Sequence, residues 1–361
     1  EGVYRTHLAQ LRGCAPDDHF ALLAACGKDL PGAVRAAPVE LSAAQWAQMV
    51  GPHIQAHMDV QEQPLEEGIS LSGVQPKYGV TEHHGRYVAR VRNEDSHIIA
   101  KLPVADKAYL PEVEHLGLSL AQQAGVYTCR ASVEPLSALD IPEQVLDTTS
   151  HFLAVERFDR SVFGRVHCED FCQVFGKMPT EKYSKAITYS HVGRLLWKLT
   201  NDESQVHELL RRLLVNELLG NPDMHLKNMG LWYEHPSTPR LSPAYDVVPY
   251  AVYHPVRGHA LRIVPSQEKH QTLGPSIVRA FCNYVGIAEK PAQRALKDTT
   301  ARVHELWPDM LASTELHESL KAKLVAHIES HPFMHSYRRR HASGMSSACL
   351  VSDTLPGYTK D

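Results

Sequence analysis

The stretch that decides the fold assignment is Asn221-Pro-Asp-Met-His-Leu-Lys-Asn228, which is followed downstream by Ser242-Pro-Ala-Tyr-Asp246. It supplies two acids and an amide, with Asp223 and Asn228 five residues apart and Asp246 further along the chain. In phosphoryl-transfer sites a loop Asp accepts the proton of the attacking hydroxyl, a following Asn binds one Mg²⁺, and a second Asp holds the metal at the phosphates. The pattern therefore predicts this chemistry, with Asp223 as the base and Asn228 and Asp246 as metal ligands.

The residues just before this stretch predict a helix that ends where the acidic loop begins. Residues 202–219 carry apolar side chains at spacings of three and four, which is typical of a helix with a buried face. Asp202 is a candidate N-cap, and Gly220 stands where the helix should stop. Asp223 is therefore expected just past the end of a buried helix.

The residues after the loop predict a hairpin. Residues 229–233 are typical of a short strand, the Pro-rich residues 234–240 predict a turn, and residues 241–248 predict a return strand that carries Asp246. The alternative is purely structural, because Asn-Pro-Asp is also a common turn sequence. The motif therefore needs support from elsewhere in the chain.

An ATP-dependent enzyme also needs a cation at the phosphates, and Lys101 is the candidate. It lies in the apolar run 96–103, and a lysine on a buried strand is costly unless an anion meets it. The alternative is an edge strand from which the side chain reaches water. Residues 111–125 predict a helix whose first turn offers Glu112 and Glu114; either could pair with Lys101, or both could simply favour a helix N-terminus.

Five motifs in order resemble the HipA-type serine/threonine kinases of bacterial toxin–antitoxin systems. They are Ser70-Leu-Ser-Gly-Val-Gln-Pro-Lys77, the lysine strand, Val155-Glu-Arg-Phe-Asp-Arg160, the stretch 221–228, and Leu241-Ser-Pro-Ala-Tyr-Asp-Val-Val-Pro249. The likeness runs from about Gly2 to about Pro332. Residues 2–8 resemble the middle of the family's N-terminal region, so we expect that a preceding subdomain of about a hundred residues is absent.

The resemblance implies a role for each candidate residue. Asp223 is the catalytic base, Asn228 and Asp246 bind Mg²⁺, Lys101 contacts the ATP phosphates, and Glu114 is the partner of Lys101. His225 is placed near the γ-phosphate, where an imidazole can donate a hydrogen bond. The remaining ATP-binding residues that the resemblance implies are Ser72, Gly73, Val74, Gln75 and Lys77 in the phosphate loop, Glu156 and Phe158 beside adenine, and Asp246.

The resemblance also implies a form of self-inhibition. HipA-type kinases are inhibited when they phosphorylate a serine of their own phosphate loop, and Ser70 and Ser72 occupy that loop here. A phosphoserine adds about 1.5 to 2 negative charges close to the ATP phosphates, so the closed loop is expelled. We expect autophosphorylation at Ser70, Ser72 or both.

The predicted fold is α+β, a two-lobed protein-kinase-like fold with a small, β-rich N-lobe and a mainly helical C-lobe. Residues 169–175 are interpreted as a helix at the lobe junction. The expected divisions are a helical N-terminal segment at 1–60, the N-lobe with the phosphate loop and lysine strand at 61–158, the helical C-lobe with the catalytic loop and metal-binding Asp at 159–333, and a flexible tail at 334–361.

Composition bounds the partners and the compartment. The chain has 361 residues, is 43% hydrophobic and carries a net charge of −4, so it can bury a large core and shows no general basic footprint for direct nucleic-acid binding. Seven cysteines at irregular spacings indicate free thiols in a reducing compartment, so the cytoplasm is expected. The sequence contains no run of 18 apolar residues, so no membrane span is predicted. The group His167-Cys168-x3-Cys172 lacks a second ligand pair, so zinc is not predicted.

The resulting prediction is an ATP- and Mg²⁺-dependent protein serine/threonine kinase of the HipA toxin type. The resemblance implies a protein substrate, as family members modify aminoacyl-tRNA synthetases, and a HipB-like DNA-binding antitoxin as partner. Two alternatives stay open at this point. One is a small-molecule kinase of related fold, and the other is a non-catalytic nucleotide-binding partner of a repressor.

Overall fold

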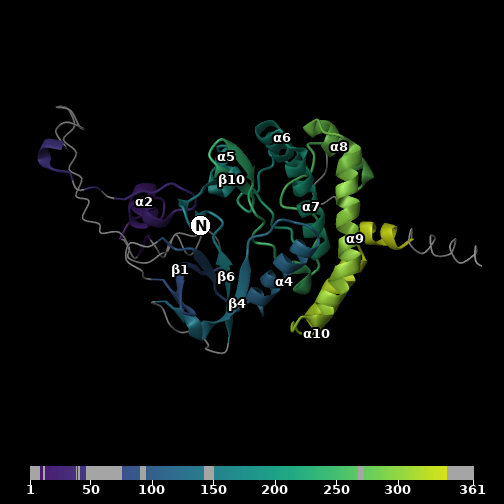
Figure 1. Cartoon of the computed structure of the whole chain (residues 1–361), viewed down its shortest axis with the longest axis horizontal. Helices are drawn as coiled ribbons and strands as arrows, with labels where there is room; N and C mark the ends of the chain where they lie inside the picture. Colours follow the sequence, from purple (N-terminus) through teal and green to yellow (C-terminus); the bar gives the residue numbers. More distant parts are fainter. Residues whose placement is uncertain are drawn as a thin grey trace, which may run out of the picture. The chain divides into compact units, whose positions relative to one another are not determined.

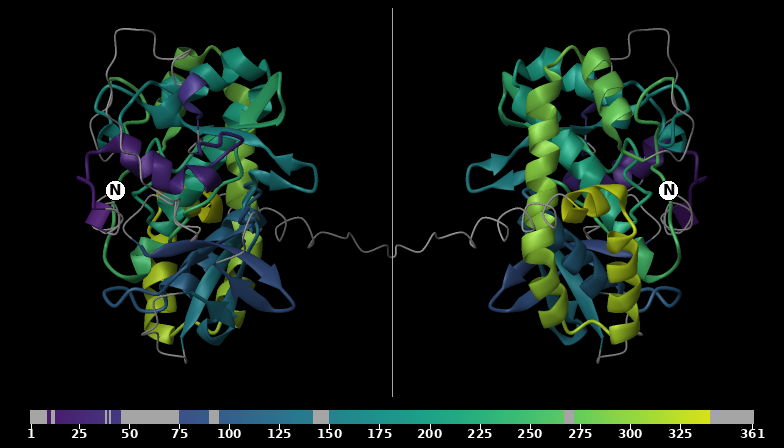
Figure 2. Two further views of the ribbon diagram at one scale, coloured as in Figure 1. Left: turned by 90° about the vertical axis from the view of Figure 1, so that its left-hand side faces the viewer. Right: turned by 90° about the vertical axis from the view of Figure 1, so that its right-hand side faces the viewer.

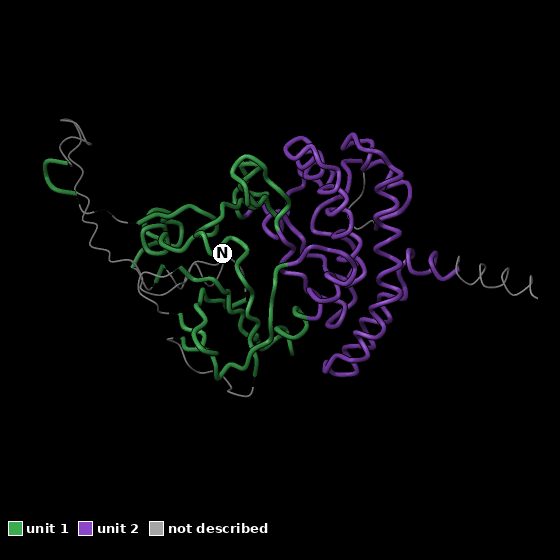
Figure 3. Tube along the Cα trace, in the orientation of Figure 1, with its two compact units in different colours: residues 1–115, 129–179, 230–242 green, residues 116–128, 180–229, 243–361 purple. Residues whose placement is uncertain are grey.

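The computed structural model of this chain describes residues 9–10, 13–37, 39, 41–45, 75–89, 95–141, 150–266 and 272–339. The chain divides into two compact units, which Figure 3 distinguishes by colour. Unit 1 comprises residues 1–115, 129–179 and 230–242, and unit 2 comprises residues 116–128, 180–229 and 243–361. The phosphate-loop candidates Ser70, Ser72, Gly73 and Val74 lie outside the described residues.

Unit 1 is built on a mixed sheet with the strand order β4-β6-β3-β1-β2-β5. Figure 1 labels its strands β1, β6 and β4. Neighbouring strands are antiparallel except β2 and β5, which run parallel. Ile98 and Ile99 explain why β3 is extended, because β-branched side chains pack well on a pleated surface. The strands are β1 (Lys77–His83), β2 (Arg86–Val88), β3 (Ile98–Lys101), β4 (Ala131–Pro135), β5 (Leu139–Asp140) and β6 (His151–Glu156).

The core of this sheet is formed by side chains from one of its faces, among them Val80, Ile98, Phe152 and Ala154. Strand β3 lies between β6 and β1, so Lys101 at its end is on an inner strand. The alternative that Lys101 lies on an edge strand is therefore wrong. Helix α4 (Leu110–Gln123) follows β3, and Gly125 after it has a φ of 91°, as the expected glycine stop requires.

A second, three-stranded sheet of unit 1 joins distant parts of the chain in the order β11-β10-β9. Its strands are β9 (His167–Asp170), β10 (Gly230–His235) and β11 (Thr238–Leu241). The prediction of one helix over 169–175 is wrong, because residues 167–170 pair with β10 and only the short helix α5 (Phe171–Val174) follows. Asp170 caps α5 in a capping box with Gln173, which explains where the strand gives way to the helix. Unit 1 also contains α2 (His19–Cys26) and the ribbon of β7 (Arg160–Ser161) and β8 (Gly164–Arg165).

Unit 2 is helical and centres on α7 (Glu203–Leu219), which packs against α6 (Tyr189–Thr200), α9 (Glu289–Ser313) and α10 (Glu318–Glu329). The predicted helix at 202–219 is confirmed, with its caps. The Asp202 carboxylate accepts the backbone N–H of Ser204, and Gly220 ends the helix with a left-handed φ of 62°. Most of α7 is buried on every side, which explains its run of leucines. Helix α8 (Pro275–Val285) completes the group.

Helices α9 and α10 run alongside each other in both views of Figure 2. Trp307 of α9 is buried, and its indole N–H donates to the carbonyl of Leu120 in α4 at 2.9 Å. Beyond α10, residues 332–339 are helical and Met334 is buried. The segment that was predicted to be a flexible tail therefore starts with a helix, while its residues 340–361 lie outside the described residues.

The predicted hairpin exists, but its return strand lies earlier in the chain than expected. The return strand is β11, at 238–241, and residues 242–248 form no regular strand. Asp246 stands in this irregular segment with a left-handed φ of 59°. That conformation excludes a strand and is uncommon for any residue other than glycine, so contacts from elsewhere in the fold must hold it.

The α+β class is as predicted, with a β-rich unit and a mainly helical unit. Among the described residues, no helix combines the length and the apolar character that crossing a bilayer requires. The six described cysteines, Cys14, Cys26, Cys129, Cys168, Cys172 and Cys282, are all free thiols.

Candidate active site

The loop after α7 is closed on itself by hydrogen bonds to the backbone of Asp223. The Asp223 carbonyl accepts the backbone N–H of His225 at 2.8 Å and the side-chain amide of Asn228 at 2.9 Å. The Asp223 N–H in turn donates to the side-chain oxygen of Asn221 at 3.0 Å. The spacing of Asp223 and Asn228 thus has a structural cause, since Asn228 reaches back across the loop that presents Asp223.

A pair of asparagines ties this loop to Asp246. The Asn221 side-chain amide donates to the side-chain oxygen of Asn216 in α7 at 2.6 Å and to the carbonyl of Asp246 at 3.3 Å. Asn216 and Asn221 are both buried, so each bond replaces water that the amide groups lost on folding. The second bond is one contact between the loop and the backbone of Asp246, which has a left-handed conformation.

Asn228 and Asp246 line one small cavity of unit 2, together with Asn216 and Asn221. A carboxylate and an amide oxygen suit Mg²⁺, which is a hard cation that prefers oxygen ligands and keeps several waters. Because the amide nitrogen of Asn228 is used inside the loop, its oxygen is the atom that can bind a cation. In the described part of the chain no group of three or more His, Cys, Asp or Glu residues is placed to hold a metal, so a site here depends on the amide as well as the acids.

His225 is buried beside Asp223, and only 4% of its surface is exposed. Burial lowers the pKa of the imidazole, although the Asp223 carboxylate acts in the opposite direction. The ring is therefore neutral near pH 7. Its Nδ1 accepts the backbone N–H of Lys227 at 3.3 Å, so in the neutral ring Nε2 carries the proton and is the nitrogen that can donate.

Among the described residues, the hydroxyl groups of three tyrosines from outside the loop donate hydrogen bonds to it. Tyr189 donates to the carbonyl of Met224 at 2.7 Å, and Tyr245 donates to the carbonyl of Lys227 at 2.9 Å. Tyr183 differs, because its hydroxyl donates to the carboxylate of Asp223 itself. Sequence reasoning missed all three contacts, since nothing in the local pattern marks a tyrosine that lies 40 residues before its partner.

In unit 1, Lys101 is paired with Glu114, and the two side-chain atoms Nζ and Oε1 are 2.5 Å apart. Lys101 is 6% exposed and Glu114 is 1% exposed, so both charges are buried and each depends on the other. Glu112, the other candidate, contacts His151 at 3.0 Å near the surface. Of the two acids in the first turns of α4, Glu114 is therefore the partner of Lys101.

The remaining described ATP-binding candidates of unit 1 lie in the strands β1 and β6 of the same sheet or next to them. Lys77 is the register partner of Lys101 across β1 and β3, and the Gln75 side-chain amide donates to the carbonyl of Leu102 at 2.7 Å. Glu156 ends β6, with its backbone N–H bonded to the carbonyl of Arg130 at 2.9 Å. Phe158 is half-buried and edge-on to Trp232, with 6.5 Å between ring centroids. That Glu156 and Phe158 contact adenine stays a prediction.

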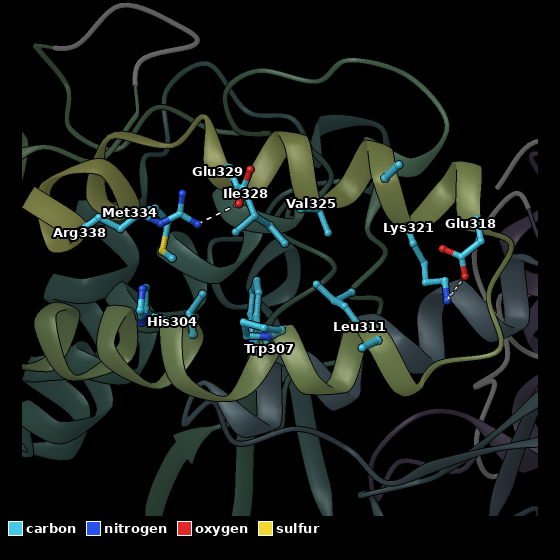
Figure 4. Close-up of a pocket in the computed structure, with 14 residues that line it drawn as sticks. His304, Trp307, Leu311, Glu318, Lys321, Val325, Ile328, Glu329, Met334 and Arg338 are labelled. Carbon is cyan, nitrogen blue, oxygen red and sulfur yellow. Dashed lines mark hydrogen bonds and ion pairs between the residues drawn. The ribbon is translucent and has the colours of Figure 1, made fainter. Parts of the chain in front are cut away.

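A groove between α9 and α10 is separate from these residues (Figure 4). It has a volume of about 650 Å³, and Trp307, Leu311, Val325 and Ile328 line it. Its two ends carry the ion pairs Lys321 with Glu318 at 2.5 Å and Arg338 with Glu329 at 2.9 Å. No candidate residue from the sequence lines this groove.

Comparison with protein families gives two matches. Residues 69–307 match the HipA-like C-terminal domain, and residues 1–37 match the HipA N-terminal domain. The first match includes every described candidate residue, from Gln75 to Asp246.

Individual proteins agree with the family matches. The protein named "Putative kinase Y4dM" of Sinorhizobium fredii is 31% identical over 343 residues, which cover 94% of this chain and 81% of that protein. The serine/threonine-protein kinase toxin HipA of Shewanella oneidensis is 22% identical over 353 residues, covering 90% of this chain and 78% of the toxin.

A solved structure shows the same fold. In the complex of HipA, HipB and operator DNA from Shewanella oneidensis MR-1, one chain superposes with a TM-score of 0.65 at 20% identity, covering 90% of this chain and 81% of that chain. The match to the HipA-like C-terminal domain spans more than half of the sequence, and the match to the HipA N-terminal domain precedes it. This chain therefore belongs to the HipA family of kinase-like toxins.

Proposed function

We propose that this protein is a protein serine/threonine kinase that transfers the γ-phosphoryl group of ATP, bound with Mg²⁺, to a hydroxyl group of another protein. The observation that carries the proposal is the frame of unit 2, in which Asn221 and Asn228 link Asp223 to Asp246 through hydrogen bonds. A base and two oxygen ligands for a metal are what phosphoryl transfer requires of its protein.

Each residue of the frame has a defined task in this proposal. The carboxylate of Asp223 orients the acceptor hydroxyl and takes its proton, while Nε2–H of His225 donates a hydrogen bond to a phosphate oxygen. Asn228 and Asp246 hold Mg²⁺, which neutralises charge on the phosphates when it is bound. Because His225 is neutral, it donates without adding a charge that would compete with the metal.

The lysines of unit 1 supply the anion-binding part of the proposal. Lys77 and Lys101 are directly opposed on antiparallel strands, and like charges in that position destabilise a sheet. Glu114 pairs with Lys101, and an anionic polyphosphate is the kind of ligand that would lower the repulsion between the two lysines. We therefore assign Lys101 to the ATP phosphates, with Glu114 as the residue that orients it.

We extend the proposal to regulation and partners. Autophosphorylation of Ser70 or Ser72 would place a phosphate where the nucleotide phosphates bind and inhibit the enzyme. The Shewanella protein was solved with HipB and DNA, and we propose a HipB-like antitoxin as the partner here. The proposed substrate is a component of translation, with aminoacyl-tRNA synthetases as the first class to examine.

Thermal unfolding with and without Mg-ATP, combined with phosphoproteomics of cells that briefly express the protein, tests the proposal. The variant is Asp246→Ala, and the matched control is Asp298→Ala, which removes an exposed carboxylate from α9. We expect Mg-ATP to raise the Tm of the parent and the control but not of Asp246→Ala. We also expect new phosphoserine or phosphothreonine on cellular proteins with the parent and the control only.

Two results would overturn the proposal. The first is stabilisation by Mg-ATP with no phosphate transferred to any protein, which would favour a nucleotide-binding partner of a repressor. The second is transfer to small alcohols but not to proteins, which would favour a small-molecule kinase. For the serine proposal, the intact mass of Ser70→Ala and Ser72→Ala variants after incubation with Mg-ATP should show the loss of a phosphate that the parent gains.

A further inference from the structure

The three tyrosines that contact the 221–228 loop do not make the same kind of contact. Tyr189 and Tyr245 donate to backbone carbonyls, which is how a hydroxyl fixes the course of a loop. Tyr189 is fully buried, as expected of a residue with a structural task. Tyr183 donates to the side chain that the proposed function identifies as the base, and it is 48% exposed.

The segment that carries Tyr183 lies against the loop at further points. The backbone N–H of Leu226 donates to the carbonyl of Lys182 at 3.2 Å, and the ring of Tyr183 is edge-on to His225 with 5.0 Å between centroids. The Lys182 ammonium lies over the Tyr183 ring, 5.2 Å from its centroid. The contacts of Lys182 with the loop and of the Tyr183 ring with Lys182 and His225 thus help to place the Tyr183 hydroxyl at Asp223.

These contacts are not needed to hold the backbone of Asp223. That backbone is already bonded through its N–H to Asn221 and through its carbonyl to Asn228 and His225. What Tyr183 adds is a hydroxyl on the carboxylate. A hydroxyl in hydrogen-bond reach of a general base is the arrangement that a phosphoryl acceptor must adopt before its proton is taken.

We infer that Tyr183 is a phosphoryl acceptor of this protein's own active site, so that the enzyme phosphorylates itself there in cis. The inference rests on the proposed function, because Asp223 must act as the base and ATP must supply the phosphoryl group. In the step, the Tyr183 oxygen forms a bond to the γ-phosphorus of ATP as the bond to the β,γ-bridging oxygen breaks. Asp223 takes the phenolic proton, and the products are phosphotyrosine, ADP and one proton.

The product cannot stay where the hydroxyl was. A phosphotyrosine carries about 1.5 to 2 negative charges, which the Asp223 carboxylate repels at hydrogen-bond distance. The modified side chain therefore leaves Asp223, and the position of the acceptor hydroxyl becomes accessible to a protein substrate. Self-modification at Tyr183 would thus act in the opposite sense to phosphorylation of the phosphate-loop serines.

Peptide mapping of the full-length protein after incubation with Mg-ATP tests the inference. We expect phosphate on Tyr183 in the parent, at a rate independent of protein concentration, and none in Asp223→Ala or Tyr183→Phe. Tyr127 is an internal control, because it is 55% exposed and should carry no phosphate. The Tyr127→Phe variant should be modified at Tyr183 as fast as the parent.

The possible failures are distinguishable. If the parent phosphorylates serines or other proteins while Tyr183 carries no phosphate, the inference is wrong and the proposed function stands. If Tyr183 gains phosphate only from a second copy, so that the rate rises with protein concentration, the cis geometry is wrong. If no acceptor of any kind gains phosphate, both the inference and the proposed function are wrong. Tyr183→Phe should fold like the parent, since the side chain is half-exposed, and its Tm provides the check.

Discussion

At the scale of single residues, the pair of Lys101 and Glu114 should affect both the stability of the protein and the nucleotide binding that we propose. Both side chains are buried, and 2.5 Å separates Nζ from Oε1. We expect Glu114→Gln to cost about 3–5 kcal/mol of unfolding free energy, because it removes the carboxylate that pairs with a buried ammonium. The double variant Lys101→Met with Glu114→Leu should recover most of that loss, since apolar groups of similar volume tolerate burial.

Urea unfolding with and without Mg-ATP separates the two properties of this pair. We expect the double variant to be stable but not stabilised further by Mg-ATP. Lys107→Met is the control, because Lys107 pairs with the exposed Asp106, and it should shift stability by less than about 1 kcal/mol. A double variant that gains as much from Mg-ATP as the parent would remove Lys101 from the phosphate site.

At the scale of elements, one buried acid, Glu217, connects the last turn of α7 to other segments of unit 2 through hydrogen bonds. The Glu217 carboxylate accepts hydrogen bonds from His259 at 2.5 Å, from His331 at 2.9 Å and from the backbone N–H of Leu273 at 2.7 Å. His327 also contacts the Glu217 carbonyl at 2.8 Å. The Glu217 side chain thus joins the segment beyond α10 and the connection before α8 to the end of α7, from which the 221–228 loop continues.

This arrangement predicts how stability depends on pH. Burial alone would raise the pKa of Glu217, but the two histidines lower it below its ordinary value of 4.5. A carboxyl group whose pKa is lower in the folded state stabilises the protein fully above about pH 4.5, and that contribution is lost as the pH falls through the folded-state pKa. Glu217→Gln should cost about 3–5 kcal/mol at pH 6 and flatten the acid limb of the stability profile.

Urea unfolding of the parent and Glu217→Gln between about pH 3 and pH 6 measures this dependence. Glu305→Gln, an exposed carboxylate on α9, serves as the control and should keep the profile of the parent. Parallel profiles for the parent and Glu217→Gln would show that the Glu217 carboxylate does not carry the acid dependence.

Elements whose cause is local could be predicted from the sequence, and those set by distant contacts could not. Asp202 and Gly220 mark the ends of α7 because caps act on their own helix. The return strand lies earlier than predicted, and Asp246 has a left-handed backbone that contacts Asn221, a residue 25 positions away that no local pattern records. The contact of Tyr183 with Asp223 also joins distant residues, so no local pattern predicts it. By contrast, a buried lysine needs an acidic partner, so an acid near Lys101 could be predicted from its apolar surroundings.

At the scale of the whole molecule, a buried ion cluster of unit 1 joins the two regions that match separate family domains. The Asp159 carboxylate, within the C-terminal match, bonds to Arg157 and Arg160 at 2.9 Å each and to the backbone N–H of Gly32 at 2.6 Å. Asp29, within the N-terminal match, bonds to the same two arginines at 3.0 and 2.7 Å. Ion pairs and hydrogen bonds of these charged side chains therefore connect the N-terminal segment to the region that matches the C-terminal domain.

Removing the central acid should release that segment without unfolding the rest of the molecule. Burial would raise the pKa of Asp159, but Arg157 lowers it, so the group is ionised at neutral pH and Asp159→Asn leaves two buried cations short of a partner. We expect a loss of about 3–5 kcal/mol and much faster tryptic cleavage at Lys28 and Arg35. The control Glu329→Gln breaks an exposed ion pair with Arg338, and trypsin should cleave this variant at Lys28 and Arg35 at the rate of the parent. If Asp159→Asn resists trypsin as the parent does, the N-terminal segment is held by its apolar contacts, and the charged cluster is not what joins the two regions.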